Sequence, residues 1–317
     1  YGTRSVPIVT SRYPVWTQPG LGEDVKAGRY YLPGNPTGGR ETLATSAIDA
    51  EPEFVMQLPM PGWPHVLAAL FVALIFLSLT ISQVVPAAIF AVLALISILV
   101  WVWDTDPGPG KGLVEIAEGH RVPSYATGPQ SISWWAMVLL MIVGAALYLS
   151  FVFSYLYLWT VSPQVWPDPT RTPLSSVQWP LASAVLLVAS GILIEAARRL
   201  LPGPGGQSVA MPIAAALAAV ALAASFALDL VPQLRAGLDP SQDAYAALTY
   251  LAIGLQGMLV VLLVIAAGFV IARHWTGLLD RERCLSMQTT CLLWFYAVGQ
   301  GLLGLLIVHG FPRLVGG

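Results

Sequence analysis

The sequence predicts an all-α membrane protein with seven transmembrane helices behind an irregular N-terminal tail. Of the 317 residues, 56% are hydrophobic and only 10% are charged, with a mean hydropathy of +0.71. Soluble chains carry about 25% charged residues. The deficit is concentrated in long uncharged runs, each long enough to cross a bilayer. This composition excludes a soluble enzyme and a disordered chain.

Each predicted span supplies the roughly 20 apolar residues that about 30 Å of hydrocarbon requires. No polar face recurs every 3.6 residues, as it would in the core helices of a soluble protein. The spans are residues 63–82, 84–103, 134–160, 178–200, 208–230, 245–273 and 287–309. Almost nothing separates the first two, so they must form a tight hairpin (residues 61–103).

The basic residues predict the orientation of the chain. If successive loops alternate between the two sides, twelve of the 15 Lys and Arg residues fall on the side of the N-terminal tail. The opposite side holds only Arg171, Arg235 and Arg313. Because basic residues accumulate on the cytoplasmic side, we expect a cytoplasmic N-terminus and a periplasmic C-terminus.

Three segments lie outside the predicted spans. Residues 1–60 are polar and rich in Pro and Gly, so we expect a mostly irregular cytoplasmic tail. Residues 104–130 form a second cytoplasmic loop, and residues 161–177 form a proline-rich outward loop that we expect to be rigid. The remaining part, residues 131–317, forms a five-helix membrane domain.

The two cysteines and the start of the chain carry little information on chemistry. Cys284 and Cys291 lie seven residues apart, about two helical turns, which is too far for a disulfide. The chain begins at Tyr1 and shows no signal-peptide pattern. We interpret it as a processed product or as a fragment of a longer polypeptide.

The four histidines do not predict a metal site. His65, His120, His274 and His309 are scattered over both sides of the membrane, and no two have the spacing that places imidazoles on one metal. We expect interfacial or exposed histidines. There is also no phosphate-binding loop, no nucleophile elbow and no Cys/His cluster, so we predict no catalytic, cofactor-binding or metal-binding residue in this chain.

Two carboxylates lie within the predicted spans. Charged side chains are energetically costly inside a membrane, so these two residues are candidates for a functional role. Glu195 precedes Arg198 and Arg199 by three and four residues, which predicts a salt bridge within one helix. Asp229 lies near the outer end of its span and could reach water or headgroups. Two carboxylates at opposite faces cannot form a proton path, which argues against a self-contained ion pump.

Small residues indicate how the helices pack. Ala215, Ala219, Ala223 and Ala227 recur every four residues, and we expect them to line one packing face. We expect Gly299, Gly301 and Gly304 to allow close approach in the last span. Such faces bring transmembrane helices together where lipid offers no hydrophobic drive.

Several strings resemble subunit III of heme-copper cytochrome c oxidases. Residues 134–137 (WWAM), 154–158 (SYLYL) and 163–167 (PQVWP) are similar to the opening, the end and the following loop of one helix of that subunit. Residues 245–260 look like its penultimate helix. The tail strings 11–16 (SRYPVW), 29–33 (RYYLP), 40–43 (RETL) and 49–52 (DAEP) resemble the cytoplasmic tail of fused subunit I/III polypeptides.

The resemblance implies a two-helix hairpin followed by five subunit III-like helices in a bacterial inner (plasma) membrane. It implies an accessory component of a terminal oxidase, which supports oxygen reduction and proton pumping by stabilising the catalytic subunit and organising lipid. Heme and copper are then expected in partner subunits, and subunit I, subunit II and phospholipid are the expected partners. By position, Trp135, Tyr155 and Tyr157 are candidates for lipid or interface contact, with ordinary helix packing as an equal alternative.

The sequence departs from this family at several polar positions, and the family's closing Trp-His-Phe-Val-Asp string reads WFYAV at residues 294–298. Many members carry a buried glutamate where Gly144 stands, and Gln256 and Leu259 replace two histidines. We expect these losses to remove any titratable site from the membrane interior. A small-molecule transporter or channel, and a purely structural membrane subunit outside respiration, remain as alternatives. The electron donor, cytochrome c or quinol, is left open.

Overall fold

The computed structural model describes residues 9–27, 29, 41–46, 48–57, 62–105, 113–117, 119–126, 131–163, 176–241 and 244–315. Seven of its helices are long and apolar enough to span a membrane, which confirms the predicted multi-pass helical architecture. Most of the proline-rich loop and its PQVWP string, together with Arg171 and much of the tail, lie outside the described residues. The chain divides into two compact units at residues 132/133.

The first unit contains strands, so the expectation of an all-α chain with an irregular tail is wrong for these segments. After two short helices, α1 (Pro14–Thr17) and α2 (Leu21–Lys26), β1 (Glu41–Thr45) pairs antiparallel with β2 (Pro52–Gln57). In the segment that follows α4, β3 (Leu113–Ala117) pairs antiparallel with β4 (His120–Pro123).

The two strand hairpins pack on each other through β2 and β4. Val55, Ile116 and Val122 form a small buried core, with Leu43 and Val114 packed against it. These strands have only four to six residues, and alternation over so short a run is a weak signal for a strand. The stability of each hairpin therefore depends on the other, because an isolated two-stranded hairpin is marginal in water.

Helices α3 (Trp63–Thr80) and α4 (Val84–Thr105) form the predicted tight hairpin. Ser82 adopts a left-handed conformation with φ 58°, and the N–H of Gln83 donates to the Ser78 carbonyl at 2.8 Å. This is the reversal that commonly ends a helix. Ala68 and Ala87 are buried where the two helices meet, consistent with the close packing that small side chains allow.

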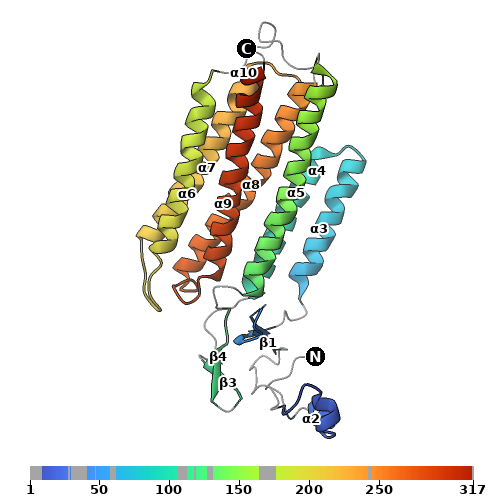
Figure 1. Ribbon diagram of the computed structural model, residues 1–317, viewed down its shortest axis with the longest axis vertical. Coiled ribbons are helices and arrows are strands. Elements are labelled where there is room, and N and C mark those ends of the chain that lie inside the picture. Colours follow the sequence, from blue (N-terminus) through green and yellow to red (C-terminus); the bar gives the residue numbers. More distant parts are fainter. Residues whose placement is uncertain are drawn as a thin grey trace. The chain divides into compact units, whose positions relative to one another are not determined.

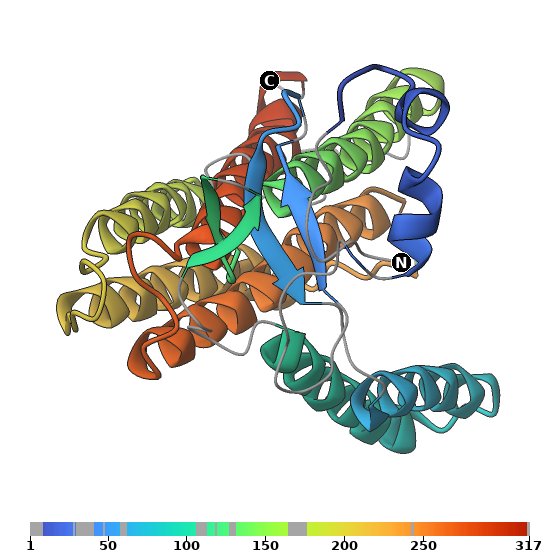
Figure 2. The ribbon, with the colours of Figure 1, turned by 90° about the horizontal axis from the view of Figure 1, so that it is seen from below.

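The second unit is a bundle of five long helices, the last of which is followed by a π-helical turn and a short α-helix. Figures 1 and 2 show the long helices of this unit running alongside one another. Its elements are α5 (Ile132–Val161), α6 (Gln178–Arg199), α7 (Ala210–Arg235), α8 (Ala244–Trp275), α9 (Leu285–Leu305), the π-helical turn η2 (Leu306–Gly310) and α10 (Phe311–Val315). Helix α7 continues through Pro232 to Arg235, whereas the predicted span ended at residue 230. A proline so near a helix end disturbs few backbone hydrogen bonds.

The core of the bundle lies between α6, α7, α8 and α9. Trp294 is its largest fully buried side chain, and the indole Nε1 donates to Ser190 Oγ at 3.1 Å. Helix α5 joins through aromatic residues instead: Tyr148, Phe151 and Tyr155 pack against α8 and η2. Large rings hold α5 further from its neighbours than small residues would, because helix spacing follows the side chains at the contact.

The predicted alanine face of α7 is only partly correct. Ala215 is fully buried and Ala219 is half-buried, but Ala223 and Ala227 are exposed on the bundle surface. A strict four-residue repeat advances 400°, so it drifts around a helix with 3.6 residues per turn. The buried stripe instead passes from Ala215 through Ala218 to Leu222.

Two of the three glycines in α9 allow close packing, as predicted. A Cβ at Gly301 would lie 2.6 Å from Leu187 Cδ2, and one at Gly304 would lie 2.7 Å from the Tyr148 hydroxyl. Gly299 has nothing within 4 Å of its Cβ position and plays no such part. Gly301 thus lets α9 approach α6 and α8 closely, and Gly304 leaves room for the Tyr148 side chain that reaches over from α5.

Candidate functional site

The π turn η2 continues the last span after α9 and directs most of its side chains into the bundle. A π-helical turn adds a residue to the helical ladder, and such turns occur often at functional sites. Two buried tyrosines hold this one in place: Tyr155 donates to the Ile307 carbonyl at 3.2 Å and Tyr245 donates to the Val308 carbonyl at 3.3 Å. His309 follows Val308 in this turn, and its side chain therefore points into the bundle.

His309 and Asp229 form a buried polar pair between η2 and α7. The imidazole Nε2 lies 2.6 Å from Asp229 Oδ1, and the side chains are only 7% and 15% exposed. On the other ring nitrogen, Gln233 Nε2 lies 3.5 Å from Nδ1. In the tautomer with its proton on Nε2, the imidazole donates to the carboxylate and accepts from Gln233 at Nδ1.

The pair corrects three expectations. His309 and also His274 are buried in the bundle and are not exposed. Asp229 is turned toward a histidine, not toward water or headgroups. The loss of the family's polar residues at Gly144 and Gln256 has not removed every titratable group from the span region, because Asp229 and His309 both lie within the apolar helices.

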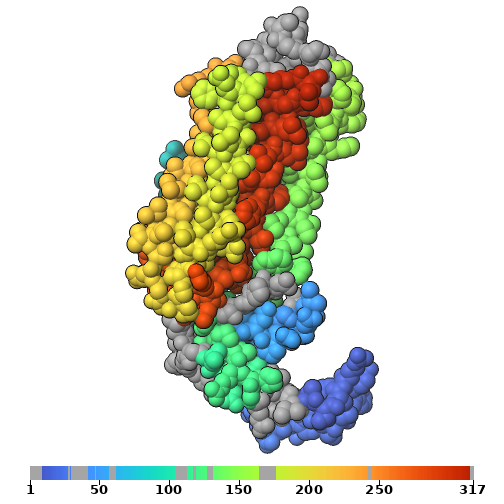
Figure 3. Space-filling model, turned by 60° about the vertical axis from the view of Figure 1, so that its left-hand side comes forward, coloured from blue at the N-terminus to red at the C-terminus, as the bar shows by residue number. Residues whose placement is uncertain are grey.

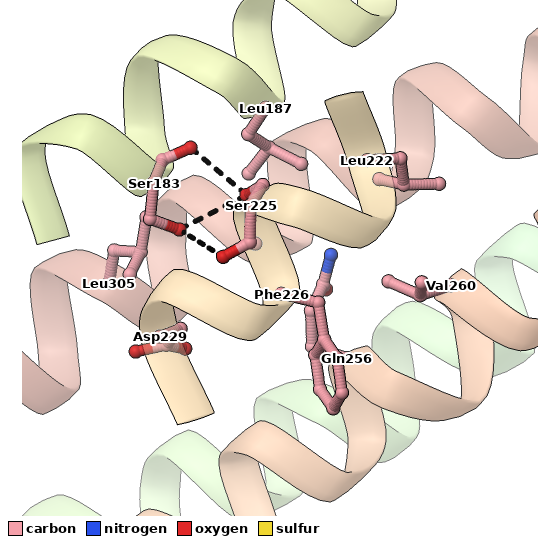
Figure 4. A pocket seen from close by; sticks show the side chains of 10 residues that line it. Ser183, Leu187, Leu222, Ser225, Phe226, Asp229, Gln256, Val260 and Leu305 are labelled. Atoms are coloured by element: carbon pink, nitrogen blue, oxygen red, sulfur yellow. Dashed lines mark hydrogen bonds between the residues drawn. The ribbon is translucent and has the colours of Figure 1, made fainter. Parts of the chain in front are cut away.

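Ser183 of α6 and Ser225 of α7 form a second polar contact in the bundle (Figure 4). The Ser183 hydroxyl donates to the Ser225 carbonyl at 2.9 Å, and the Ser225 hydroxyl donates to the Ser183 carbonyl at 3.0 Å. The hydroxyl oxygens lie 3.0 Å apart, and both residues are buried. Each hydroxyl thus satisfies a partner on the other helix, which matters where no water is available.

A small cavity of about 10 Å³ lies beside these residues, close to the smallest volume that holds one water. Polar groups of Ser183, Ser225, Asp229 and Gln256 line it together with apolar side chains (Figure 4). Gln256 Nε2 donates to the Ala297 carbonyl at 3.2 Å, whereas its Oε1 is buried and has no partner among the described residues. A water here could serve these groups, since a buried water needs two to four polar partners.

Near the middle of α9, Tyr296 donates to Gln300 Oε1 at 2.7 Å. Gly144 of α5 lies opposite: a Cβ there would be 3.1 Å from the Tyr296 hydroxyl oxygen. The position where the resembled family often has glutamate is therefore next to a tyrosine hydroxyl in this chain. A longer side chain at Gly144 would have to displace that ring.

At the other end of α6, the expected salt bridge is present. Arg198 makes two hydrogen bonds of 2.7 Å to the Glu195 carboxylate, and Arg199 Nε adds a third of 2.8 Å. The arginine side chains are 43% and 75% exposed. This cluster is separate from the Asp229 site.

The predicted lipid or interface contacts have different surroundings. Tyr155 is fully buried and packs within the bundle. Tyr157 is 54% exposed and stacks on Phe153, also on the outer surface of α5. Trp135 is half-buried and meets Trp134 edge to face. Of the three, Tyr157 presents the largest exposed fraction to lipid.

Within the described residues, no three His, Cys, Asp or Glu side chains gather in a way that could hold a metal ion. His65 contacts Trp101, and His120 is exposed on β4. The polar groups that do meet are paired with one another. Their arrangement can bind a water and fix helices in register.

Together, the fold and these contacts define a multi-pass helical membrane protein whose interior polar groups join its own helices. Compared with models of known protein families and with curated proteins, the chain gives no match.

Proposed function

We propose that this chain is an accessory, subunit III-like membrane component of a heme-copper terminal oxidase. In this role it stabilises the catalytic subunit and organises lipid, while heme, copper and oxygen chemistry reside in partner subunits. The observation that carries the proposal is the order of the spans: a two-helix hairpin in one compact unit, followed by five long helices in another. The strings that resemble subunit III and the tail of I/III fusions occur in the matching places along the chain.

The polar chemistry of the bundle fits a bracing role. Asp229 is engaged by His309, Glu195 by two arginines, and Ser183 by Ser225. Internally paired groups tie helices together and leave the outer surfaces apolar. Much of that surface is large hydrophobic side chains, among them Phe153, Ile192 and Val220, each more than 60% exposed. Such surfaces suit lipid and neighbouring membrane helices.

A transporter or channel is less well supported. The polar cavity by Ser183 holds about 10 Å³, whereas small-molecule sites are about 300–1,000 Å³. It has room for about one water, and no substrate fits there.

Under this proposal the chain lies in a bacterial inner membrane with the N-terminal tail in the cytoplasm. The distribution of Lys and Arg between the loops supports that orientation. Subunits I and II, and phospholipid, are the proposed partners. Subunit I would be either a separate chain or an upstream part of the same polypeptide.

Affinity purification from native membranes tests the proposal. An affinity tag on this chain should recover heme-containing protein with a reduced-minus-oxidised heme spectrum and with oxygen uptake on a reduced donor. The same purification from an untagged strain is the control. Tagged material without heme or oxygen uptake would overturn the assignment. Heme held by the chain after its partners are stripped away would overturn the proposed division of roles.

A further inference from the structure

A groove of about 490 Å³ runs along the outside of the bundle between α6 and α9. Figure 3 shows these two helices side by side on one face of the molecule. Most of the groove is apolar, and its lining from α6 and α9 is Val188, Gly191, Ile192, Ala196, Phe295 and Val298, with Glu195 and Arg199 completing it. Its volume falls in the range of small-molecule sites, about 300–1,000 Å³.

The groove is polar only toward one end. Val188 and Arg199 are eleven residues apart on α6, so the lining extends about 16 Å along the helix axis. Arg199 is the last residue of α6, where the span ends. An apolar channel of this length, capped by a charge at the membrane edge, has the shape of an acyl chain beneath its headgroup.

Glu195 makes more hydrogen bonds to Arg198 than to Arg199. Arg198 uses both Nε and Nη2 on the carboxylate, whereas Arg199 uses Nε alone. In the described structure the two terminal nitrogens of Arg199 have no protein partner, and its side chain is 75% exposed. The carboxylate therefore positions Arg199 and leaves donors in the fork geometry that suits phosphate oxygens.

The charge at this end of the groove is positive. Two arginines against one carboxylate leave one excess positive charge. Arg281 lies close by, with Nε donating to the Leu201 carbonyl at 2.9 Å, but it is flanked by Asp280 and Glu282 and adds no further net charge. Basic pockets between transmembrane helices bind the headgroups of anionic lipids. A zwitterionic headgroup brings its own cation and matches this excess less well.

From these observations we propose that the α6–α9 groove binds an anionic phospholipid, with one acyl chain along the apolar lining and the phosphate on Arg199. The proposal rests on the lipid-organising role proposed above and gives that role a site and a lipid class; its test uses this chain alone, so it can fail while the oxidase assignment stands.

The test measures lipid bound to the full chain in nanodiscs of phosphatidylcholine supplemented with phosphatidylglycerol, by native mass spectrometry after release. R199Q removes the guanidinium charge and its paired donors and should weaken phosphatidylglycerol binding about tenfold. R235Q makes the same change at the exposed end of α7, outside the groove, and should leave binding unchanged.

A second pair of variants tests the acyl channel. A196F places a ring in the groove and should likewise weaken phosphatidylglycerol binding, whereas A223F adds the same ring at an exposed position of α7 outside it. Loss in R199Q and A196F, with retention in both controls, supports the proposal. Equal binding in all variants, an equal loss in R235Q, retention in R199Q, or equal retention of phosphatidylcholine would overturn it.

Discussion

His309 and Asp229 are 80 residues apart in the sequence, yet their side chains meet at 2.6 Å inside the bundle. The contact joins the π turn after α9 to the last third of α7. Because both groups are nearly buried, removing either leaves a polar or charged partner without compensation. That asymmetry makes the pair a sensitive reporter of the bundle's integrity.

We expect D229A and H309A each to lower the free energy of unfolding by about 3 kcal/mol, the scale for breaking a buried pair. The double variant should lose less than the sum, with a coupling energy of at least about 1 kcal/mol. D229N keeps an acceptor oxygen and should lose less than D229A. The measurement is denaturant unfolding in detergent micelles. Strictly additive losses would show that the two side chains do not interact.

The serine pair should contribute less, although it is fully buried. Hydrogen bonds between transmembrane helices average about 0.6 kcal/mol and reach about 1.7 kcal/mol. We therefore expect S183A or S225A to cost about 1 kcal/mol, and the double variant little more, because each removes the same reciprocal contact. S150A on the exposed face of α5, where the hydroxyl bonds within its own helix, is the control. If S150A lowered the free energy of unfolding as much as S183A, the contact between Ser183 and Ser225 would contribute no specific stability.

Gly257 and Gly254 offer a matched comparison on α8. A Cβ at Gly257 would lie 2.8 Å from Cζ of Phe226, whereas nothing lies within 4 Å of that position at Gly254. We expect G257A to lower the unfolding free energy by about 1–3 kcal/mol through overpacking. G254A should be neutral or stabilising, since alanine favours a helix by up to about 1 kcal/mol. Stabilities measured side by side decide this, and equal effects would contradict the close contact at Phe226.

The seven spans could be predicted because their signal is local: each is a long apolar run with few charges. The Glu195 salt bridge was equally predictable, since all its partners lie within four residues on one helix. The four-residue spacing of the alanines was a less reliable signal, because Ala223 and Ala227 are exposed. Residues spaced four apart do not stay on one face of an α-helix, because each step advances 400° and moves the position further around the helix, away from the core.

The Asp229–His309 pair could not be predicted by the same means. The alternation of spans places both residues at the same end of the bundle, and this is the one sequence signal that could have suggested a meeting. Whether they touch depends on which helices are neighbours and on the π turn that directs His309 inward. The local hydrophobic periodicity of the sequence predicts neither the helix neighbours nor the π turn. The short strands of the first unit were missed for a related reason. Their stability comes from packing on each other, through Val55, Ile116 and Val122, and not from a pattern within one segment.

Cys284 provides a test of how the start of α9 is covered. It directly precedes the last span, and burial raises the pKa of its thiol above the ordinary value. Gln288 Nε2 also donates to its Sγ at 2.9 Å. Since the thiolate is the reactive form, a raised pKa leaves less of it at neutral pH, so alkylation should be slower than for an exposed cysteine. The rate should keep rising with pH beyond the point where a free thiol levels off.

The measurement is the pH dependence of iodoacetamide labelling in a C291S variant, which leaves Cys284 as the single thiol. T276C supplies the control, because Thr276 is exposed in the neighbouring turn after α8; it is labelled in a chain that also carries C284S and C291S. If Cys284 reacts as fast as the cysteine in this control at every pH, its thiol is open to solvent. The segment between α8 and α9 would then be packed less closely on the bundle than the structure shows.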